Sequence, residues 1–293
     1  MKQQLAPHIA LSSRADVRVA LLGGEASFHH QAAMQCLGQV EPVYCDSFQA
    51  VADAVGQGTT SLAIMAVENT LVGLMLPNLH LIVQRGLHIV GEHYLQIELQ
   101  LLAPAGATPA GIHTLYSHPY AFQQCEPFLA QYPRLARIER SDTADAARRV
   151  AELADPGVAA LAGRLQGQHY GLQVVAADVH AHTQNFTRFL VLAKQGSVPQ
   201  PNKATFWFRL AHQPGSLAHV LQVFALHKLN LTKLTSIAVA EYPNDFAFWV
   251  EFTFDSYTHY QIALELIRPK VKQLHILGEY AASDLAPFQP ERI

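Results

Sequence analysis

Four short segments of the chain carry side chains that could bind a small anion and assist a leaving group. They are SFHHQAA (27–33), AVENTLVG (66–73), SHPYAFQQC (117–125) and NFTRFLVL (185–192). They supply hydroxyl and amide donors, a carboxylate at Glu68 and a guanidinium at Arg188. A guanidinium can hold a carboxylate through two parallel hydrogen bonds, a geometry that a lysine cannot reproduce. The pattern therefore indicates a site that binds a carboxylate and donates a proton or a hydrogen bond to a leaving group.

The elements expected around these segments place them at one edge of a sheet. The expected strand and helix pairs are 17–22 with 27–38, 62–67 with 76–85, 114–116 with 119–129, and 158–161 with 163–170. Strands that alternate with helices predict an α/β unit with largely parallel strands, whose ligands bind beyond the carboxyl ends of the strands. Ser27 and Ser117 are predicted helix N-caps, and the positive end of a helix favours a carboxylate.

A second, smaller unit is expected after a polar linker. Residues 194–203 read KQGSVPQPNK, with two prolines and a glycine. The elements expected beyond it are a strand at 204–210, a helix at 216–227, a strand at 230–239, a turn at 242–245, a strand at 246–254, a helix at 257–267 and a strand at 274–279. This βαββαβ order is the ferredoxin-like arrangement. A second copy would most simply cover its sheet edge or helix-free face, which predicts a homodimer or a dimer of dimers.

Composition excludes several classes of protein. The chain has 293 residues, of which 50% are apolar and 15% charged, with a formal net charge of -3. Without a basic run, nucleic acid is not an expected partner. The apolar stretches are of strand length and the N-terminus has no apolar signal region, so neither a membrane span nor secretion is expected and the cytoplasm is the default. The three cysteines lack CxxC spacing and the sixteen histidines lack a ligand pattern, so no metal site is predicted.

The four segments in this order, followed by the βαββαβ tail, resemble prephenate dehydratase with a C-terminal ACT domain. The resemblance runs from about residue 17 to 280. It implies a two-lobed α/β fold like that of type II periplasmic binding proteins, with the active site in the cleft. It also implies that prephenate loses its ring hydroxyl and carboxylate together, without a cofactor, to give phenylpyruvate, carbon dioxide and water in phenylalanine biosynthesis. The expected boundaries are an N-terminal tail 1–15, a catalytic domain 16–195, a linker 196–202, an ACT regulatory domain 203–281 and a C-terminal tail 282–293.

The resemblance assigns roles to residues of the four segments. It makes Thr187 of the Thr-Arg-Phe motif essential, with a hydroxyl that donates to the leaving oxygen. Glu68 is a hypothetical proton source, provided that burial and the charge of the substrate raise its pKa. His118 is a rival acid because the ordinary imidazole pKa lies near neutrality. The expected catalytic residues are Thr187, Glu68, Asn69, Arg188, Ser117 and Gln124, with Ser27 and Phe189 in substrate binding.

The resemblance also implies that phenylalanine binds the ACT domain and inhibits. The effector site is expected at Pro214, Gly215, Ser216, Leu217, Ala218, Asn230 and Leu231. The Glu-Ser-Arg-Pro signature of the family reads Thr-Ser-Ile-Ala at 235–238, where only Ser236 remains. We therefore expect weakened or altered inhibition. In the catalytic part, His29 replaces a small hydroxyl residue of the family, and the segment with Ser141 and Asp142 supplies no catalytic carboxylate to the expected site.

Three other functions remain open from the sequence. An arogenate dehydratase would act on the aminated analogue of prephenate in the same cleft. A non-catalytic metabolite sensor would use the same cleft and tail, although it need not keep Thr187, Arg188, Glu68 and Asn69. A solute-binding protein for transport is disfavoured by the fused βαββαβ tail.

Overall fold

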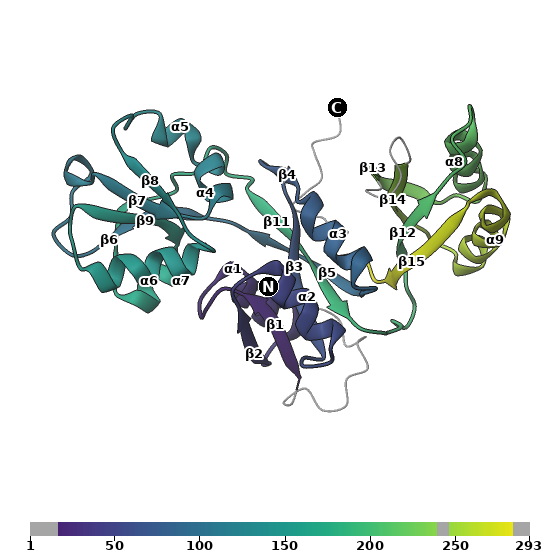
Figure 1. Cartoon of the computed structure of the whole chain (residues 1–293), viewed down its shortest axis with the longest axis horizontal. Coiled ribbons are helices and arrows are strands. Elements are labelled where there is room, and N and C mark those ends of the chain that lie inside the picture. Colours follow the sequence, from purple (N-terminus) through teal and green to yellow (C-terminus); the bar gives the residue numbers. More distant parts are fainter. Residues whose placement is uncertain (1–16, 239–245, 284–293) are drawn as a thin grey trace.

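The structure is a computed structural model that describes residues 17–238 and 246–283. The residues in these two ranges form three sheets, and we call the units built on them the first lobe, the second lobe and the tail domain. Figure 1 shows the first lobe between the other two. Within the described ranges, no helix is long and apolar enough to cross a membrane.

The first lobe is a sheet of order β2-β1-β3-β11-β5, with the short β4 paired to β3. Its elements are β1 (Arg18–Leu22), α1 (Phe28–Leu37), β2 (Glu41–Cys45), α2 (Phe48–Gly56), β3 (Leu62–Asn69), β4 (Gly73–Leu74), α3 (Leu76–Gln84), β5 (His88–Gln96) and β11 (Phe186–Ala193). Most of β1 and β3 is continuously apolar because both strands are central and covered on both faces. Strands β1, β2 and β3 are parallel as predicted, whereas β11 runs antiparallel to β3 and β5.

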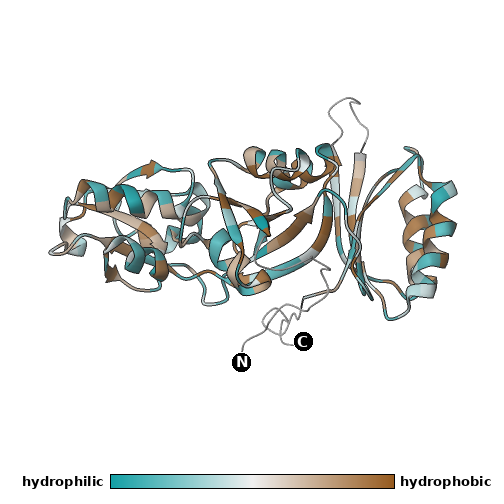
Figure 2. Ribbon diagram, turned by 90° about the horizontal axis from the view of Figure 1, so that it is seen from below, coloured by the Kyte–Doolittle hydropathy of each residue, from teal (hydrophilic) through white to brown (hydrophobic). Residues whose placement is uncertain are grey.

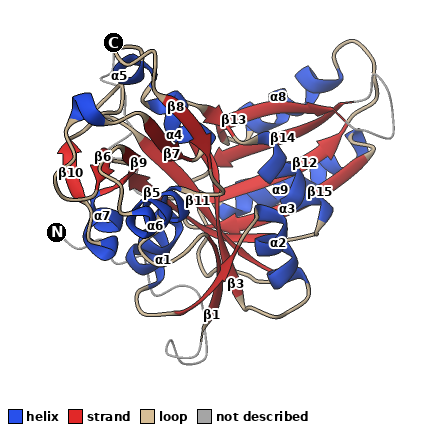
Figure 3. Cartoon of the chain, turned by 60° about the vertical axis from the view of Figure 1, so that its left-hand side comes forward, coloured by secondary structure: helices blue, strands red, loops and turns tan. Residues whose placement is uncertain are grey.

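The second lobe is a sheet of order β10-β6-β9-β7-β8 (Figure 3). Its elements are β6 (Leu99–Ala103), a 3-10 turn (Pro109–Gly111), β7 (Thr114–Ser117), α4 (Pro119–Gln124), α5 (Glu126–Leu129), β8 (Ala136–Glu139), α6 (Thr143–Leu153), β9 (Val158–Gly163), α7 (Arg164–Tyr170) and β10 (Gln173–Ala176). The chain enters this lobe between β5 and β6 and leaves it between β10 and β11. The sheet is mixed, since β6 runs antiparallel to β9 and β10, so the expectation of largely parallel strands holds only in part.

The tail domain has the βαββαβ order expected from the sequence. Its elements are β12 (Lys203–Arg209), α8 (Ser216–Leu226), β13 (Asn230–Ala238), β14 (Phe246–Thr253), α9 (Tyr257–Ile267), a 3-10 turn (Arg268–Lys270) and β15 (Gln273–Tyr280). The sheet order is β13-β14-β12-β15, and both helices cover one face. The turn expected at 242–245 lies outside the described residues.

The first lobe covers the helix-free face of the tail sheet (Figure 2). Trp207, Trp249 and Leu277 of this face are buried in the same apolar core as the first lobe. Contact is close at Gly278, where a Cβ atom would collide with the carbonyl group of Ile89. The expectation that a second copy covers this face is therefore wrong. The first lobe already removes these apolar side chains from water. The tail sheet has two edge strands, β13, which pairs only with β14, and β15, which pairs only with β12.

Candidate active site

A cleft lies between the two lobes and receives side chains from both. Its polar lining residues are Ser27, His29, His118, Tyr120, Gln124, Asp142, Thr143 and Thr187. Its apolar lining residues are Leu22, Phe28, Phe48, Ala66, Met75, Ile97, Leu99, Ala121 and Phe189. Among the described residues that line it, none is a lysine or an arginine. An anion in this cleft must therefore be held by neutral donors and helix N-termini.

A chain of three amide side chains holds the hydroxyl of Thr187. Asn69 Nδ2 lies 3.1 Å from Thr187 Oγ1 and donates to it, and also lies 2.8 Å from Asn185 Oδ1. Asn185 Nδ2 in turn donates to Gln124 Oε1 over 2.9 Å, which joins the first lobe to α4 of the second. Because Thr187 Oγ1 accepts from Asn69, its own hydrogen is available to a molecule in the cleft. Thr187, Phe189 and Gln124 line the cleft as their predicted roles require, and Asn69 reaches it through Thr187.

The two predicted N-cap serines have different positions. Ser27 caps α1, with Oγ accepting from His30 N over 3.2 Å, and it lines the cleft. Ser117 instead ends β7, and its hydroxyl donates to the carbonyl oxygen of Leu161 over 2.7 Å. His118 is the N-cap of α4, because its Nδ1 accepts from Tyr120 N. Ser117 is fully buried, so its hydroxyl is used inside the second lobe.

Glu68 and Arg188 point away from the cleft, which corrects the expectation of a carboxylate clamp and a proton source there. Arg188 is buried against Glu92 and Glu251, with ion-pair distances of 2.6 and 2.8 Å. Glu68 pairs with Lys233 of the tail domain over 2.6 Å. Side chains alternate between the two faces of a strand, so the residues next to Thr187 and Asn69 face the tail domain.

The two histidines of the cleft are neutral at physiological pH. Burial lowers the pKa of His118 to about 4, and burial together with the nearby His118 lowers the pKa of His29 to about 3. His118 Nδ1 is an acceptor, so in the neutral ring the proton sits on Nε2. His118 is therefore a neutral hydrogen-bond donor, and the hypothesis that it is a charged acid at neutral pH is not supported.

The lowered pKa of His118 predicts a pH dependence of stability. The unfolded chain protonates this ring below about pH 6.5, whereas the folded protein does so only near its pKa of about 4. Folding is thus favoured fully above pH 6.5, and the contribution falls as the pH drops toward 4. Relative to His118→Gln, whose amide can still accept from Tyr120 N, the wild type should lose up to about 3 kcal/mol of unfolding free energy between pH 7 and 4. Urea titrations of both proteins measure this, and parallel pH curves would contradict the prediction.

Sequence reasoning missed several cleft residues. Asp142 is buried, caps α6 through Ala144 N and Asp145 N, and lines the cleft with Thr143. Burial raises its pKa, and the capping amides act in the opposite direction. An aspartate before an alanine-rich amphipathic helix is a usual N-cap pattern, which was the available signal. His29 had no such signal, because a single histidine in a helix is more often structural.

The residues expected to bind phenylalanine form two separate groups in one chain. Asn230 pairs with Thr253, and Thr253 pairs on its other side with Lys203, the first residue of β12. Asn230 therefore lies at the end of the sheet where β12 begins. The loop with Pro214 instead follows the other end of β12, and a strand of seven residues spans about 20 Å. The first group is Pro214, Gly215, Ser216, Leu217 and Ala218, and the second is Asn230 and Leu231. One amino acid cannot touch both groups of a single chain.

The cysteines and acidic residues give no sign of a metal centre. In the ranges that the structure describes, no group of three or more His, Cys, Asp or Glu side chains could hold a metal ion. Cys36 and Cys125 are buried free thiols, and burial raises the pKa of each to about 12. These two thiols are protonated and unreactive at neutral pH.

Comparison with known proteins gives the family. The family model for prephenate dehydratase matches residues 19–197. Arogenate dehydratase/prephenate dehydratase 2 of Arabidopsis thaliana is 33% identical over 290 residues, which cover 94% of this chain and 75% of the relative.

Two solved structures share the whole architecture. A prephenate dehydratase from Arthrobacter aurescens in complex with L-Phe is 25% identical, covers 90% of each chain and has a TM-score of 0.81. GqqA, described as a quorum quenching acylase, is 29% identical over 92% of this chain and 99% of its own, with a TM-score of 0.79. The matched residues include all four segments of the cleft and its surroundings, so this chain belongs to the prephenate dehydratase family.

Proposed function

We propose that the chain converts prephenate to phenylpyruvate, carbon dioxide and water. The electron pair of the breaking carbon–carbon bond enters the ring as carbon dioxide leaves, and the ring hydroxyl departs and takes a proton to become water. Aromatisation provides the driving force, so the protein must orient the substrate and stabilise the departing oxygen. The observation that carries the proposal is Thr187, whose hydroxyl hydrogen is left available in the cleft by the bond from Asn69.

The substrate is a dianion, and neutral groups are proposed to hold it. Helix α1 begins at Ser27 in the cleft wall, and its first-turn N–H groups together with the helix dipole favour a carboxylate. The first turn of α6 is already capped by the Asp142 carboxylate, so this helix is not assigned a substrate carboxylate. His118 Nε2 and the amide of Gln124 add further donors, since Gln124 Oε1 already accepts from Asn185. The apolar walls exclude water and strengthen each of these hydrogen bonds.

Neither Glu68 nor a charged histidine supplies the proton in this proposal. Glu68 is paired with Lys233 outside the cleft, and the histidines are neutral. A threonine hydroxyl does not ionise near neutral pH, so Thr187 acts as a hydrogen-bond donor to the departing oxygen. The proton then comes from water, and neutral His118 contributes only the hydrogen-bond donor Nε2.

One experiment tests the activity and its nearest rival. The purified protein is incubated separately with prephenate and with arogenate, and phenylpyruvate and phenylalanine are quantified against a heat-denatured sample. Phenylpyruvate from prephenate supports the proposal. Product from arogenate alone would reassign the substrate, and product from neither would leave the non-catalytic binding function.

A second candidate reaction comes from the likeness to GqqA. The cleft combines apolar walls, including Phe28, Phe48 and Phe189, with an absence of lysine and arginine among its described lining residues. These features suit a neutral substrate with an apolar tail, as an acylase would need. Release of free amine from N-acyl amides of increasing chain length measures this activity, and it should depend on Thr187 if the same cleft is used.

We also propose that phenylalanine regulates the enzyme at a site shared by two copies of the tail domain. The support is the separation of the two residue groups along β12, together with the open edge β13. If β13 edges approach each other in antiparallel fashion, the Pro214 loop of one copy comes beside Asn230 of the other. Sedimentation velocity in the presence and absence of phenylalanine measures the assembly, and a monomer that still binds phenylalanine would contradict it.

Phenylalanine is expected to inhibit only weakly. The Glu-Ser-Arg-Pro signature is reduced to Ser236, which removes two charged side chains from β13. We expect half-inhibition near or above about 1 mM, equivalent to about 4 kcal/mol of binding free energy. Turnover measured with increasing phenylalanine tests this, with tyrosine as a control ligand. Half-inhibition at micromolar concentration would contradict the prediction.

A further inference from the structure

Two pairs of neighbouring residues join the cleft to the tail domain. On β11, Thr187 faces the cleft and Arg188 faces the tail domain. On β3, Asn69 contacts Thr187 on the cleft side, and Glu68 contacts Lys233 of the tail domain. The strands are paired so that Thr187 lies opposite Asn69 and Arg188 lies opposite Glu68. The same short stretch of backbone therefore carries the proposed catalytic hydroxyl and a contact with the tail domain.

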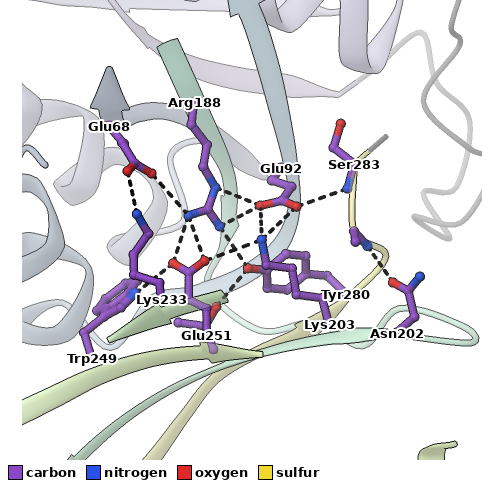
Figure 4. A network of polar contacts seen from close by, with 12 residues as sticks. Glu68, Glu92, Arg188, Asn202, Lys203, Lys233, Trp249, Glu251, Tyr280 and Ser283 are labelled. Atoms are coloured by element: carbon purple, nitrogen blue, oxygen red, sulfur yellow. Dashed lines mark hydrogen bonds and ion pairs between the residues drawn. The ribbon is translucent and has the colours of Figure 1, made fainter. Parts of the chain in front are cut away.

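Arg188 is the centre of a buried charge cluster formed by Glu92, Arg188, Lys203, Glu251 and Tyr280 (Figure 4). Two members come from the first lobe, and three, namely Lys203, Glu251 and Tyr280, come from the tail domain. Arg188 Nη1 lies 2.9 Å from Glu251 Oε1, and Lys203 Nζ lies 2.8 Å from Glu92 Oε2. Trp249 Nε1 also donates to Glu251 over 2.8 Å, which orients this carboxylate. The positive charges of Arg188 and Lys203 balance the negative charges of Glu92 and Glu251.

The end of β11 at Thr187 pairs differently with its two neighbouring strands. Its register with β5 is continuous from Phe186 to Val191, whereas its register with β3 is interrupted. A register shift follows Arg188, so that Phe189 lies opposite Ala66 and Val67 is passed over. The extra residue of this bulge lies on β3, so the hydrogen-bond ladder between β3 and β11 is interrupted just beyond Thr187 and Arg188. Two anchors hold this end of β11 on opposite faces, Asn69 on the cleft side and the Arg188 cluster on the tail side.

We propose that Glu251 of the tail domain is a positioning residue for Thr187. It acts through Arg188, which fixes the end of β11, so the tail domain is a structural part of the active site as well as a regulatory one. The proposal rests on the proposed dehydratase function. A catalytic group displaced by about 1 Å can lose about 100-fold in rate, so a small shift of β11 is enough to reduce turnover.

The test uses a variant that keeps the cluster neutral. Glu251→Gln alone would leave a buried cation without its partner, whereas Glu251→Gln with Lys203→Met leaves Arg188 paired with Glu92. In the full-length double variant we expect kcat to fall at least about tenfold and KM to stay within about threefold, because the cleft lining is unchanged. The matched control is Glu279→Gln, which removes a tail-domain carboxylate bound to Tyr257 and Tyr260. Its kcat should stay within about twofold.

A spectroscopic measurement separates this proposal from the proposed function. The 13C-labelled methyl group of Thr187, assigned by its loss in Thr187→Ser, should shift in the double variant and not in Glu279→Gln. If the wild type does not turn over prephenate, the dehydratase function fails while the methyl shift still decides the positioning role. An unmoved Thr187 methyl resonance, or a folded double variant with kcat within about threefold of wild type, would overturn the proposal.

Discussion

Replacing Thr187 by valine is expected to lower kcat for prephenate by about 100- to 1,000-fold, the usual effect of removing one positioned donor to a developing negative charge. Valine matches the shape of threonine and removes only the hydroxyl. The hydroxyl is bonded to Asn69 and lines the cleft, so its loss should leave KM within about threefold because substrate carboxylates are held elsewhere. Steady-state kinetics with prephenate measure both constants.

Thr187→Ser is the matched control for the valine variant. Serine keeps the hydroxyl and the contact with Asn69, so we expect at least about one-tenth of wild-type kcat. The valine variant leaves Asn69 Nδ2 with its acceptors Asn185 and Phe186, and stability should change by only about 1 kcal/mol. A valine variant with near wild-type kcat would remove Thr187 from catalysis.

Arg188→Met is expected to lower the free energy of unfolding by about 3–5 kcal/mol, the range seen when one partner of a buried ion pair is removed. Glu92 and Glu251 would remain buried with only Lys203 to balance them. The two tryptophans of the chain, Trp207 and Trp249, lie at the interface of the tail domain and the first lobe. Their fluorescence during urea unfolding therefore reports the loss directly.

A neutral double variant and the pH dependence test the cause of this loss. Arg188→Met with Glu251→Gln keeps the Lys203–Glu92 pair and should recover more than half of the stability. Burial opposes ionisation of Glu251, but the charges of Arg188 and Lys203 outweigh it and lower its pKa to about 2. The contribution of ionised Glu251 to the free energy of unfolding is present above about pH 4.5 and is lost as the pH falls toward 2. The difference in unfolding free energy between wild type and Arg188→Met should therefore narrow over that range. A gap that is constant with pH would point to packing as the cause.

The helices and strands that were predicted from the sequence have local signals. Helix α1 begins after Ser27 and ends at Gly38, as its N-cap and the following glycine indicate. The helix at Tyr257–Ile267 has the predicted bounds. The antiparallel direction of β11 was not predictable, because it depends on where the chain returns from the second lobe. The residues of the strand itself do not encode this direction.

The candidate site was also predictable only in part. The order of the four segments was sufficient to indicate the family, and Thr187, Asn69 and Gln124 were among the residues expected at the site. The structure joins these three in one hydrogen-bond network through Asn185. It could not tell that Arg188 and Glu68 leave the cleft, because a period of two gives alternation but not which face is buried against another domain. Burial also reversed the expectation for His118, since the pKa of an imidazole depends on surroundings that come from distant segments.

By itself, the sequence determined the family, the βαββαβ order of the tail domain, and several of the residues that lie in or beside the cleft, among them Thr187 and Gln124. These features depend on residue type and spacing, which are local. Only the tertiary structure decided that the charged neighbours of Thr187 and Asn69 belong to the tail domain and that the first lobe covers the tail sheet. Ion pairs such as Arg188 with Glu251 join residues far apart in the chain, and their formation requires that desolvation and pairing balance in the folded protein.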